Sequence, residues 1–342
     1  MTQKKIASDA ALVTDSDYLN ALLKLLDQAE NEINILAYSF AIGSAAGKLN
    51  MNTAPYTIAE KIKELKRKKP ELRIRLYIEG VRDTSDRNMV TAQFLKRAGV
   101  EVVYGKTHAK GFSIDGRYVL FGSTNLTHQS IVKNYETNLL IDNKVVAKEF
   151  NRYFEHLWQG GGHGGIELRP PMLADGDFKN VLVDMIHSAK RTLEFSIYFF
   201  DHKEIRDAFI EAHRRGVKIK GFAHHHTAFA LSYVRRTRRT IERLQEEGID
   251  SLYFAPGSFF THSKYLIKDK EEVALGTGNW LVEDVEIHPQ LYIHLKNKEL
   301  AQQLSKHLAK QIAKQRDASE ETHTKPRLLR SRTRSSESRT AR

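Results

Sequence analysis

The sequence predicts an α/β protein made of two similar units, each with a mixed β-sheet. Segments 18–40 and 178–200 align without gaps at an offset of 160 residues. In both halves, amphipathic helical patterns alternate with short apolar runs typical of strands. A short motif of His, Lys, Asp and Asn also occurs once in each half. Such regular alternation of helices and strands favours an α/β architecture.

We expect the same order of elements in both halves. Each aligned segment begins as a helix and ends as a strand, at 33–40 and at 193–200. A second helix and strand follow in each half, at 58–68 and 72–78, and at 205–215 and 217–223. A third helix is expected around 89–98 and around 235–247. Gly99 and Gly248 stand just after these helices, where glycine commonly ends a helix.

Composition divides the chain into three parts. Residues 159–165 read QGGGHGG, which marks a flexible joint or a tight turn. We place the boundary there, between an N-terminal unit at 1–165 and a C-terminal unit at 166–314. From residue 315 onward the chain is rich in Arg, Ser and Thr and has few large apolar residues. Since such a segment buries too little surface to offset the entropy of ordering, we expect a disordered basic tail at 315–342.

Length and composition exclude several classes of protein. With 342 residues and 41% hydrophobic content, the chain can form a sizeable core. It has no cysteine, which excludes disulfides, thiolate nucleophiles and cysteine-based zinc sites. No apolar run reaches the roughly 20 residues of a transmembrane helix, and the first residues lack the apolar stretch of a secretory signal. We therefore expect a cytoplasmic protein, although a secreted mature form would have the same features.

Basic residues are in excess. Lys and Arg number 54 against 42 Asp and Glu, which gives a formal net charge of +12. This excess favours a polyanionic partner, either nucleic acid or an anionic phospholipid surface. On the predicted helix at 235–247, a compact basic run could follow a phosphate backbone through Arg235, Arg236, Arg238 and Arg239. A solvated helix face is the alternative for this run, as a solvated tail is for residues 315–342.

The repeated motif carries the chemistry. The first copy contains His108, Lys110, Asp115, Gly122, Ser123 and Asn125. The second copy contains His262, Lys264, Asp269, Gly276, Thr277 and Asn279, at identical spacing. Two matching copies, in halves that also match elsewhere, are not expected by chance.

Two histidines and two lysines at one site could cleave a phosphodiester without a metal ion. One histidine can attack phosphorus to form a covalent phosphohistidine, and the other can protonate the leaving oxygen and later activate water. Because residues i and i+2 share a face of a strand, Lys110 and Lys264 should point into the same cleft as their histidines. Two ammonium groups there would stabilise the charge on the nonbridging oxygens. We therefore expect neither a metal nor a cofactor.

The remaining motif residues have supporting roles in this interpretation. Asn125 and Asn279 would donate to the phosphate, and the small residues Ser123 and Thr277 allow close backbone approach. Asp115 and Asp269 fall at turns and are interpreted as structural.

Glu136 lies eleven residues after Asn125 and could hold one imidazole in its reactive tautomer, as the third member of a catalytic triad does. Gln290 occupies the equivalent position in the second half, so the two histidines are expected to be supported unequally. Asp284 and Glu286 are possible substitutes for the missing carboxylate.

The motif resembles the signature of the phospholipase D superfamily, and the resemblance covers most of residues 10–310. It implies two α/β/α sandwich units related by a pseudo-twofold axis, with one active site at their interface and a phosphohistidine intermediate. By the same analogy, His108 is the nucleophile and His262 the general acid. The departures from the signature are Thr277 and Gly278 in the second motif and Gln290 where an acid is common.

The resemblance leaves the substrate open, because the superfamily includes nucleases, phospholipases and phosphatidyltransferases. The basic charge, the arginine run and the tail favour a nuclease that hydrolyses DNA or RNA. A soluble phospholipase D or phosphatidyltransferase acting on phospholipid head groups is the main alternative. A catalytically silent nucleic-acid-binding protein is a third. Since one chain carries both motifs, an oligomer is not required.

Overall fold

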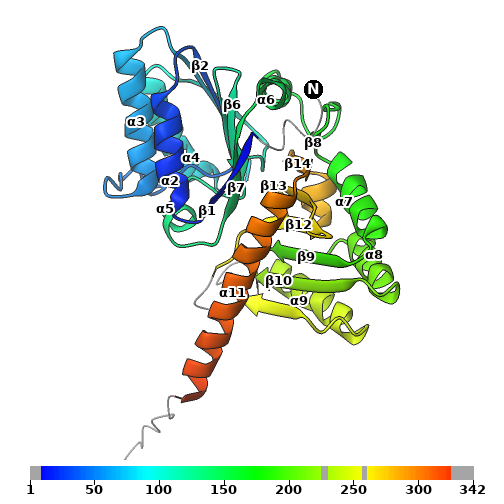
Figure 1. The fold of residues 1–342 in the computed structure, drawn as a ribbon. Coiled ribbons are helices and arrows are strands. Elements are labelled where there is room, and N and C mark those ends of the chain that lie inside the picture. The colour runs from blue at the N-terminus through cyan, green and yellow to red at the C-terminus, as the bar shows by residue number, and fades with distance from the viewer. Residues whose placement is uncertain (1–8, 83, 225–229, 256–259, 325–342) are drawn as a thin grey trace, which may run out of the picture.

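The computed structural model describes residues 9–82, 84–224, 230–255 and 260–324, with residues 316–324 described by their backbone. The chain forms two seven-stranded units (Figure 1). The elements of the first unit are β1 (Ala10–Thr14), α2 (Asp17–Asp27), β2 (Glu32–Ala37), α3 (Ala54–Lys68), β3 (Arg73–Glu79), α4 (Ser85–Arg97), β4 (Glu101–Gly105), β5 (Gly111–Ile114), β6 (Tyr118–Gly122), α5 (His128–Val132), β7 (Thr137–Asp142) and α6 (Lys144–Trp158).

The second unit repeats this order element by element. Its elements are β8 (Met172–Ala174), α7 (Asp177–Ser188), β9 (Thr192–Ile197), α8 (Lys203–Arg214), β10 (Lys218–His224), α9 (Leu231–Glu246), β11 (Leu252–Ala255), β12 (Lys264–Lys268), β13 (Glu272–Gly276), α10 (Val282–Glu286), β14 (Leu291–Lys296) and α11 (Lys298–Thr324). The strand orders are β1-β7-β6-β5-β2-β3-β4 and β8-β14-β13-β12-β9-β10-β11, the second read from its β8 edge. Both sheets therefore have the same topology.

Both sheets are mixed, so the predicted fold class is confirmed. In the first sheet β2, β3 and β4 are parallel, whereas β2 pairs with β5 antiparallel and the pairs from β5 through β6 and β7 to β1 are also antiparallel. The second sheet repeats this pattern. Gly99 and Gly248 adopt φ of +90° and +92° just after α4 and α9, as expected for helix ends.

Several element boundaries differ from the sequence-based expectation, and three of them have a clear physical reason. The strands expected to reach Phe40 and Phe200 end at Ala37 and Ile197, because the chain then leaves the sheet to form single bridges with Leu126 and Trp280. Helix α3 begins at Ala54 instead of residue 58, with Pro55 in its first turn, where the missing backbone donor of proline has no helical partner to lose.

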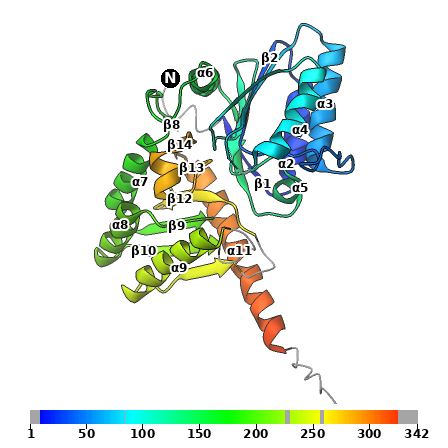
Figure 2. The ribbon, with the colours of Figure 1, turned by 180° about the vertical axis from the view of Figure 1, so that it is seen from behind.

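The two units share one hydrophobic core. Phe150, Phe154 and Tyr153 of α6 belong to the same buried cluster as Tyr265 of β12 and Leu304 of α11. Helix α6 packs on the first sheet and contacts β8, and α11 packs on the second sheet and contacts β1. Figure 2 shows α11 running along the second sheet and projecting beyond it. The units are therefore held together by packed apolar surface.

Helix α11 continues through Thr324, which differs from the disorder expected from residue 315. The stretch 315–324 (QRDASEETHT) contains Gln, Arg, Ala and Glu, which favour helix once an ordered helix precedes them. Residues 325–342, which hold most of the predicted basic tail, lie outside the described residues.

Candidate active site

Both copies of the motif lie at the junction of the two units. Lys110 directly precedes β5 and Lys264 is the first residue of β12, so each histidine lies just before its strand. The backbone amide of His108 donates to the carbonyl of Pro289 in the second unit, at 2.9 Å. The amide of His262 donates to the carbonyl of Tyr135 in the first unit, at 2.8 Å. Each histidine is therefore positioned by backbone from the opposite unit.

The imidazole of His262 is held by a buried carboxylate. Its Nδ1 lies 3.0 Å from Oε2 of Glu136 and 2.9 Å from the carbonyl oxygen of Ser123. The side chain of Glu136 is fully buried and accepts hydrogen bonds from the side chains of Ser123, Ser130 and Asn134. Since both neighbours of Nδ1 are acceptors, Nδ1 carries the proton. The unprotonated Nε2 then remains for a substrate.

The imidazole of His108 is held by an amide in place of a carboxylate. Its Nδ1 lies 2.7 Å from Nε2 of Gln290. Oε1 of Gln290 accepts from the hydroxyl of Thr277 at 2.7 Å. Oδ1 of Asp284 lies 3.6 Å from the same Nδ1, beyond hydrogen-bond distance. The unequal support expected from the sequence is therefore present as a geometric difference between the two sites.

Each unit supplies one carboxylate, but from a different position. Position 130 in α5 corresponds to position 284 in α10, as Glu136 corresponds to Gln290. The first unit has Ser130 with Glu136, and the second has Asp284 with Gln290. In the first unit the carboxylate belongs to Glu136, which contacts an imidazole. In the second unit it belongs to Asp284, and the residue that contacts the imidazole is the neutral Gln290. Glu286, the other sequence-based substitute, instead pairs with His202 at 3.1 Å.

Each histidine–lysine pair packs against a tyrosine ring that the sequence analysis missed. Tyr38 contacts His108 edge to face at 4.4 Å between ring centroids, and Tyr198 contacts His262 at 4.8 Å. The ammonium groups of Lys110 and Lys264 lie 5.2 and 5.3 Å from the centroids of Tyr38 and Tyr198. The two tyrosines occupy equivalent positions in the aligned segments 18–40 and 178–200, which was the available signal.

Burial shifts the protonation equilibria of the site. Desolvation lowers the pKa of His108 far below its usual value, and the nearby Lys110 lowers it further. Desolvation also lowers the pKa of His262, although Glu136 opposes the shift. Burial lowers the pKa of Lys110 and takes that of Lys264 to about 7. An anionic ligand near these groups would favour their positively charged forms and so raise their pKa values again.

Arg82 is a further cation near His108 that the sequence analysis missed. Its guanidinium forms an ion pair with buried Glu79 at 2.8 Å and donates to the carbonyl of Thr107 at 2.5 Å. It also lies 3.2 Å from Nδ1 of His288 in the second unit. The positive charge of Arg82 contributes to the lowered pKa of His108. No periodicity or motif in the sequence indicated this residue.

The hydrogen bonds of the two asparagines run to neighbouring loop residues, and their expected donation to a phosphate stays a prediction. Nδ2 of Asn279 donates to Oδ2 of Asp284 at 2.6 Å, and Oδ1 of Asn279 accepts from the amide of Phe199. The backbone amide of Asn125 donates to Ser130 at 3.0 Å, and its Oδ1 is buried without a hydrogen-bond partner. In the loop after β6, the hydroxyl of Ser130 accepts from the backbone amide of Asn125. In the loop after β13, the carboxylate of Asp284 accepts from both the backbone amide and the side chain of Asn279.

Asp115 and Asp269 lie at the opposite ends of β5 and β12 from the histidines. Asp115 accepts hydrogen bonds from three successive backbone amides, at residues 30–32. Asp269 does the same at residues 190–192. Both have φ of +52°, which an aspartate adopts more readily than most residues. They fix the turn that aligns each motif strand with β2 or β9.

The arginine run on α9 is divided between two environments. Arg236 forms ion pairs with Asp201 and with Glu283, the latter at 2.7 Å. It is therefore committed to structure, in contrast to the expected role in substrate binding. The other members of the run are exposed: Arg235, Arg238 and Arg239. Val234 of α9 packs with Tyr198, which brings this helix close to His262.

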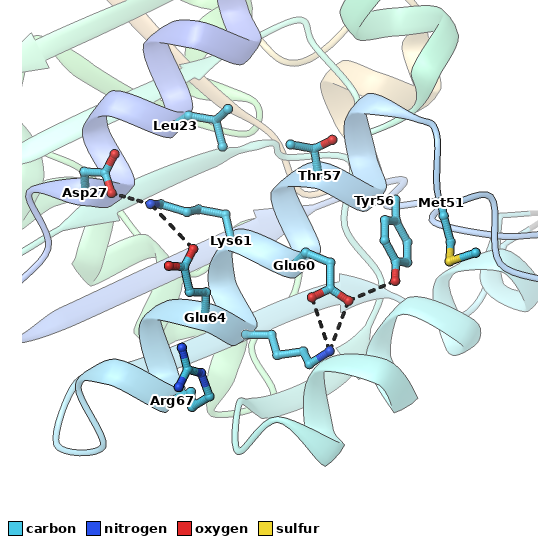
Figure 3. Close-up of a pocket in the computed structure, with 10 residues that line it drawn as sticks. Leu23, Asp27, Met51, Tyr56, Thr57, Glu60, Lys61, Glu64 and Arg67 are labelled. Atoms are coloured by element: carbon cyan, nitrogen blue, oxygen red, sulfur yellow. Dashed lines mark hydrogen bonds and ion pairs between the residues drawn. The ribbon is translucent and has the colours of Figure 1, made fainter.

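A surface hollow of about 770 Å³ lies away from these residues, between α2 and α3 (Figure 3). Most of its charged side chains pair with one another: Lys61 with Asp27 and Glu64, and Lys63 with Glu60. It contains no residue of the repeated motif. Within residues 9–82, 84–224, 230–255 and 260–324, no group of three or more His, Cys, Asp or Glu side chains is arranged to hold a metal ion. None of the described helices is both long and apolar enough to cross a membrane.

Comparison with known proteins identifies the family. A family model described as cardiolipin synthase, PLD-like domain, matches residues 22–158 and 182–312. The chain belongs to the phospholipase D-like family. It is therefore a phosphodiesterase of the phospholipase D superfamily, in which members differ in their substrates.

Two curated relatives of this phospholipase D-like chain have the same name. A mitochondrial cardiolipin hydrolase of Xenopus tropicalis is 41% identical over 69 residues, and that of Xenopus laevis is 39% identical. The aligned part covers 19% of this chain and 33% of either relative, so the chain spans about a third of their length.

Two solved structures share the fold over most of this chain. Phosphatidylserine synthase of Haemophilus influenzae has a TM-score of 0.70 and 13% identity, covering 90% of this chain and 87% of its own. Polyphosphate kinase of Porphyromonas gingivalis has a TM-score of 0.64 and 14% identity, covering 91% and 48%. At these identities the likeness establishes the fold alone.

Proposed function

We propose that this protein is a metal-independent nuclease that hydrolyses DNA or RNA through a covalent phosphohistidine. One observation carries the chemical part: the two imidazoles stand at one interface, each held through Nδ1 by the opposite unit. Among the residues that the structure describes, Nε2 of neither ring has a hydrogen-bond partner. Both rings thus offer the same nitrogen to a substrate, as an attack and a protonation at one phosphorus require.

The lysines supply the charge that a metal provides in many phosphodiesterases. Lys110 donates to the carbonyl oxygens of His108 and of Thr277 in the opposite unit. Burial is the main cause of the lowered pKa of Lys110, and the positive charge of Lys264 lowers it further. The two ammonium groups are therefore close enough to repel each other. A phosphodiester anion between them would offset this repulsion and favour both charged forms. The developing charge on the nonbridging oxygens would be stabilised in the same way.

The nucleic-acid substrate is supported by the surface beside His262. Arg235, Arg238 and Arg239 give the exposed side of α9 a row of positive charge. The aromatic residues near the start of α9 include Tyr233 and Phe260, both only partly buried. Arginines that follow a phosphate backbone and aromatic rings that stack on bases are the common elements of single-strand binding.

Phospholipid head groups are the second candidate substrate, because apolar side chains are exposed near His108. Val81 is 68% exposed and Ile287 is 47% exposed. They adjoin Arg82 and His288, whose side chains meet across the two units. The names of the relatives, a cardiolipin hydrolase and a phosphatidylserine synthase, also favour this alternative.

A parallel cleavage assay in EDTA tests the proposal. Labelled DNA and RNA oligonucleotides and vesicles containing cardiolipin are incubated with the wild type and with His108→Ala and His262→Ala. We expect cleavage of nucleic acid that both substitutions abolish. Head-group release or transfer to a primary alcohol, without cleavage of nucleic acid, would replace the nuclease by a phospholipase. Binding of nucleic acid without cleavage of either substrate would indicate a silent binding protein.

A further inference from the structure

We infer that His262 of the second motif attacks phosphorus and that His108 of the first motif is the general acid, the reverse of the order implied by the family analogy. This assignment rests on the phosphodiesterase activity proposed above. It follows from the hydrogen bonds that fix which nitrogen of each ring carries the proton.

A hydroxyl group in each unit sets the orientation of the residue beside the imidazole. The hydroxyl of Ser123 accepts from the amide of Thr137 at 2.9 Å and donates to Oε2 of Glu136 at 2.5 Å. The hydroxyl of Thr277 likewise accepts from the amide of Leu291 at 3.0 Å and donates to Oε1 of Gln290 at 2.7 Å. A carboxylate placed in this way still offers an acceptor to the imidazole. An amide placed in this way offers its NH₂ group.

The two rings therefore have opposite tautomers in their neutral forms. Nδ1 of His262 donates to Glu136, so its Nε2 presents a lone pair to the substrate. Nδ1 of His108 accepts from Nε2 of Gln290, so its own Nε2 carries the proton. A nucleophile needs the lone pair and a general acid needs the proton. To attack phosphorus, His108 would have to lose both the hydrogen bond from Gln290 and the proton on Nε2. As a general acid it keeps the proton on Nε2 and gains a second on Nδ1, which then has Oδ1 of Asp284 at 3.6 Å in place of the bond from Gln290.

The charge that develops during attack favours the same assignment. When Nε2 of His262 bonds to phosphorus, its ring retains the proton on Nδ1 and becomes positively charged. The carboxylate of Glu136, 3.0 Å away and fully buried, is placed to stabilise that charge. His108 has only the neutral amide of Gln290 at that distance. Its nearest carboxylate, Asp284, is at 3.6 Å and already accepts from Asn279 and His288.

The reaction then balances in two steps. In the first, the lone pair of Nε2 of His262 forms the P–N bond, the P–O bond breaks, and the leaving oxygen takes the proton from Nε2 of the His108 imidazolium. In the second, neutral His108 removes a proton from water, the resulting hydroxide attacks phosphorus, and the P–N bond electrons return to His262. The bound phosphodiester anion and Asp284 favour the protonated form of His108 that the first step needs.

Mapping the covalent adduct tests the assignment. Bis(4-nitrophenyl) phosphate is a suitable probe, since its leaving group departs without protonation and no lipid or nucleic-acid surface is needed. The wild type is quenched during turnover in alkaline denaturant, because P–N bonds hydrolyse in acid, and is then digested at alkaline pH and analysed by mass spectrometry. We expect the phosphoryl adduct on His262. His108→Ala and His108→Gln should still release one equivalent of nitrophenolate and accumulate the adduct, because only the second step is lost.

The outcomes separate this inference from the proposed function. An adduct on His108, in the wild type or in His262→Ala, would overturn the assignment while leaving the phosphodiesterase intact. Failure of both His108 variants to release nitrophenolate, while folded by circular dichroism and while the wild type turns over, would also overturn it. Absence of release and adduct in the wild type would reject the phosphodiesterase and this assignment with it.

Gln290→Glu provides a second readout of positioning. A carboxylate at Gln290 would stabilise the His108 imidazolium and raise its pKa. On an oligonucleotide, whose leaving oxygen needs a proton, the alkaline limb of the rate profile should therefore move up by about one pH unit. A lowered rate with an unmoved limb would instead indicate a purely structural role for Gln290. That result would remove the basis of the assignment.

Discussion

At the scale of single residues, the site is a pair of similar half-sites that differ in the group beside each imidazole. Glu136 and Gln290 occupy equivalent positions and accept from equivalent hydroxyls, but one is an anion and the other is neutral. Glu136→Gln removes this difference. We expect the rate constant for phosphodiester cleavage to fall about 10²- to 10⁴-fold, since loss of the orienting carboxylate of a triad has an effect of this order.

Steady-state kinetics on bis(4-nitrophenyl) phosphate measures that loss. Glu286→Gln is the matched control, because its carboxylate is partly exposed and pairs with His202 instead of a motif histidine. The control should keep most of the activity. A Glu136→Gln variant as active as the control would show that the carboxylate has no part in the reaction.

Lys264 illustrates a conflict between function and stability. Burial lowers its pKa to about 7, and each pKa unit of such a shift corresponds to about 1.4 kcal/mol. Lys264→Met keeps an apolar side chain of similar length while removing the buried charge. We expect the free energy of unfolding to rise by about 1–4 kcal/mol while activity is lost. Chemical denaturation at pH 7 measures this, and a less stable variant would contradict it.

The residues of the paired motif could be predicted from the sequence because their spacing is local and repeated. His108, Lys110, His262 and Lys264 could each be found by inspection, and Glu136 by its distance from Asn125. The place of Asp284 could only be left as an alternative. Asp284 is equivalent to Ser130 only when α5 and α10 are superimposed. The sequences of these two segments are too different to show that equivalence.

At the scale of elements, helix α9 connects the site to its surroundings. The sequence showed a run of arginines but not which of them face solvent. Arg236 differs from the other arginines of the run because it forms ion pairs with Asp201 and Glu283, which are both distant in sequence. Amphipathic patterns predicted the helices and strands well, whereas their ends depended on tertiary bridges, such as that between Phe200 and Trp280.

The exposed side of α9 leads to a prediction about salt. Replacing Arg235, Arg238 and Arg239 together by Gln should weaken DNA binding and make log Kd depend less steeply on log salt concentration, by about two to three in slope. Cleavage of bis(4-nitrophenyl) phosphate should be unaffected, because that substrate is too small to reach α9. Fluorescence anisotropy over a range of salt concentrations measures the slope.

Arg243→Gln is the matched control for this triple substitution. Arg243 also lies on α9 but pairs with Glu246 and Glu247 at the far end of the helix. It should leave both the affinity and the slope unchanged. If the triple variant binds DNA like the control, α9 is not the nucleic-acid surface.

At the scale of the whole molecule, the site exists only when both units are packed together. Asp175, just after β8, accepts from the hydroxyl of Tyr153 in α6 at 2.7 Å and from the amide of Gln290 at 2.8 Å. Tyr153 of the first unit thus helps, through Asp175, to position Gln290 of the second unit, which in turn contacts His108 of the first. His307 of α11 and Asp15 form the corresponding contact at 3.1 Å, and Asp15 accepts from the amide of Glu136.

The buried site should make the molecule sensitive to acid. The pKa values of His108 and His262 are lowered mainly by burial, so below about pH 6.5 the unfolded chain binds protons that the folded chain does not. Stability therefore falls as the pH drops. Burial raises the pKa of Glu136, but His262 and Lys264 outweigh it, and the lowered net value adds a loss near and below pH 4.5.

Urea unfolding between pH 8 and pH 4 measures this dependence. His108→Gln and His262→Gln should each flatten the curve between about pH 6.5 and pH 5. His187→Gln, which changes an exposed histidine on α7, should not. A wild-type curve that rises toward pH 5 would contradict the direction of both shifts.

The most direct test of a single shared site is the binding of orthovanadate, which imitates a phosphoryl group under attack. A crystal structure of the wild type with vanadate should show one vanadium per chain, with Nε2 of His108 and Nε2 of His262 on opposite sides and the two lysines on its remaining oxygens. Vanadate bound to only one histidine, or two vanadates in separate places, would show that the units do not act on one phosphorus.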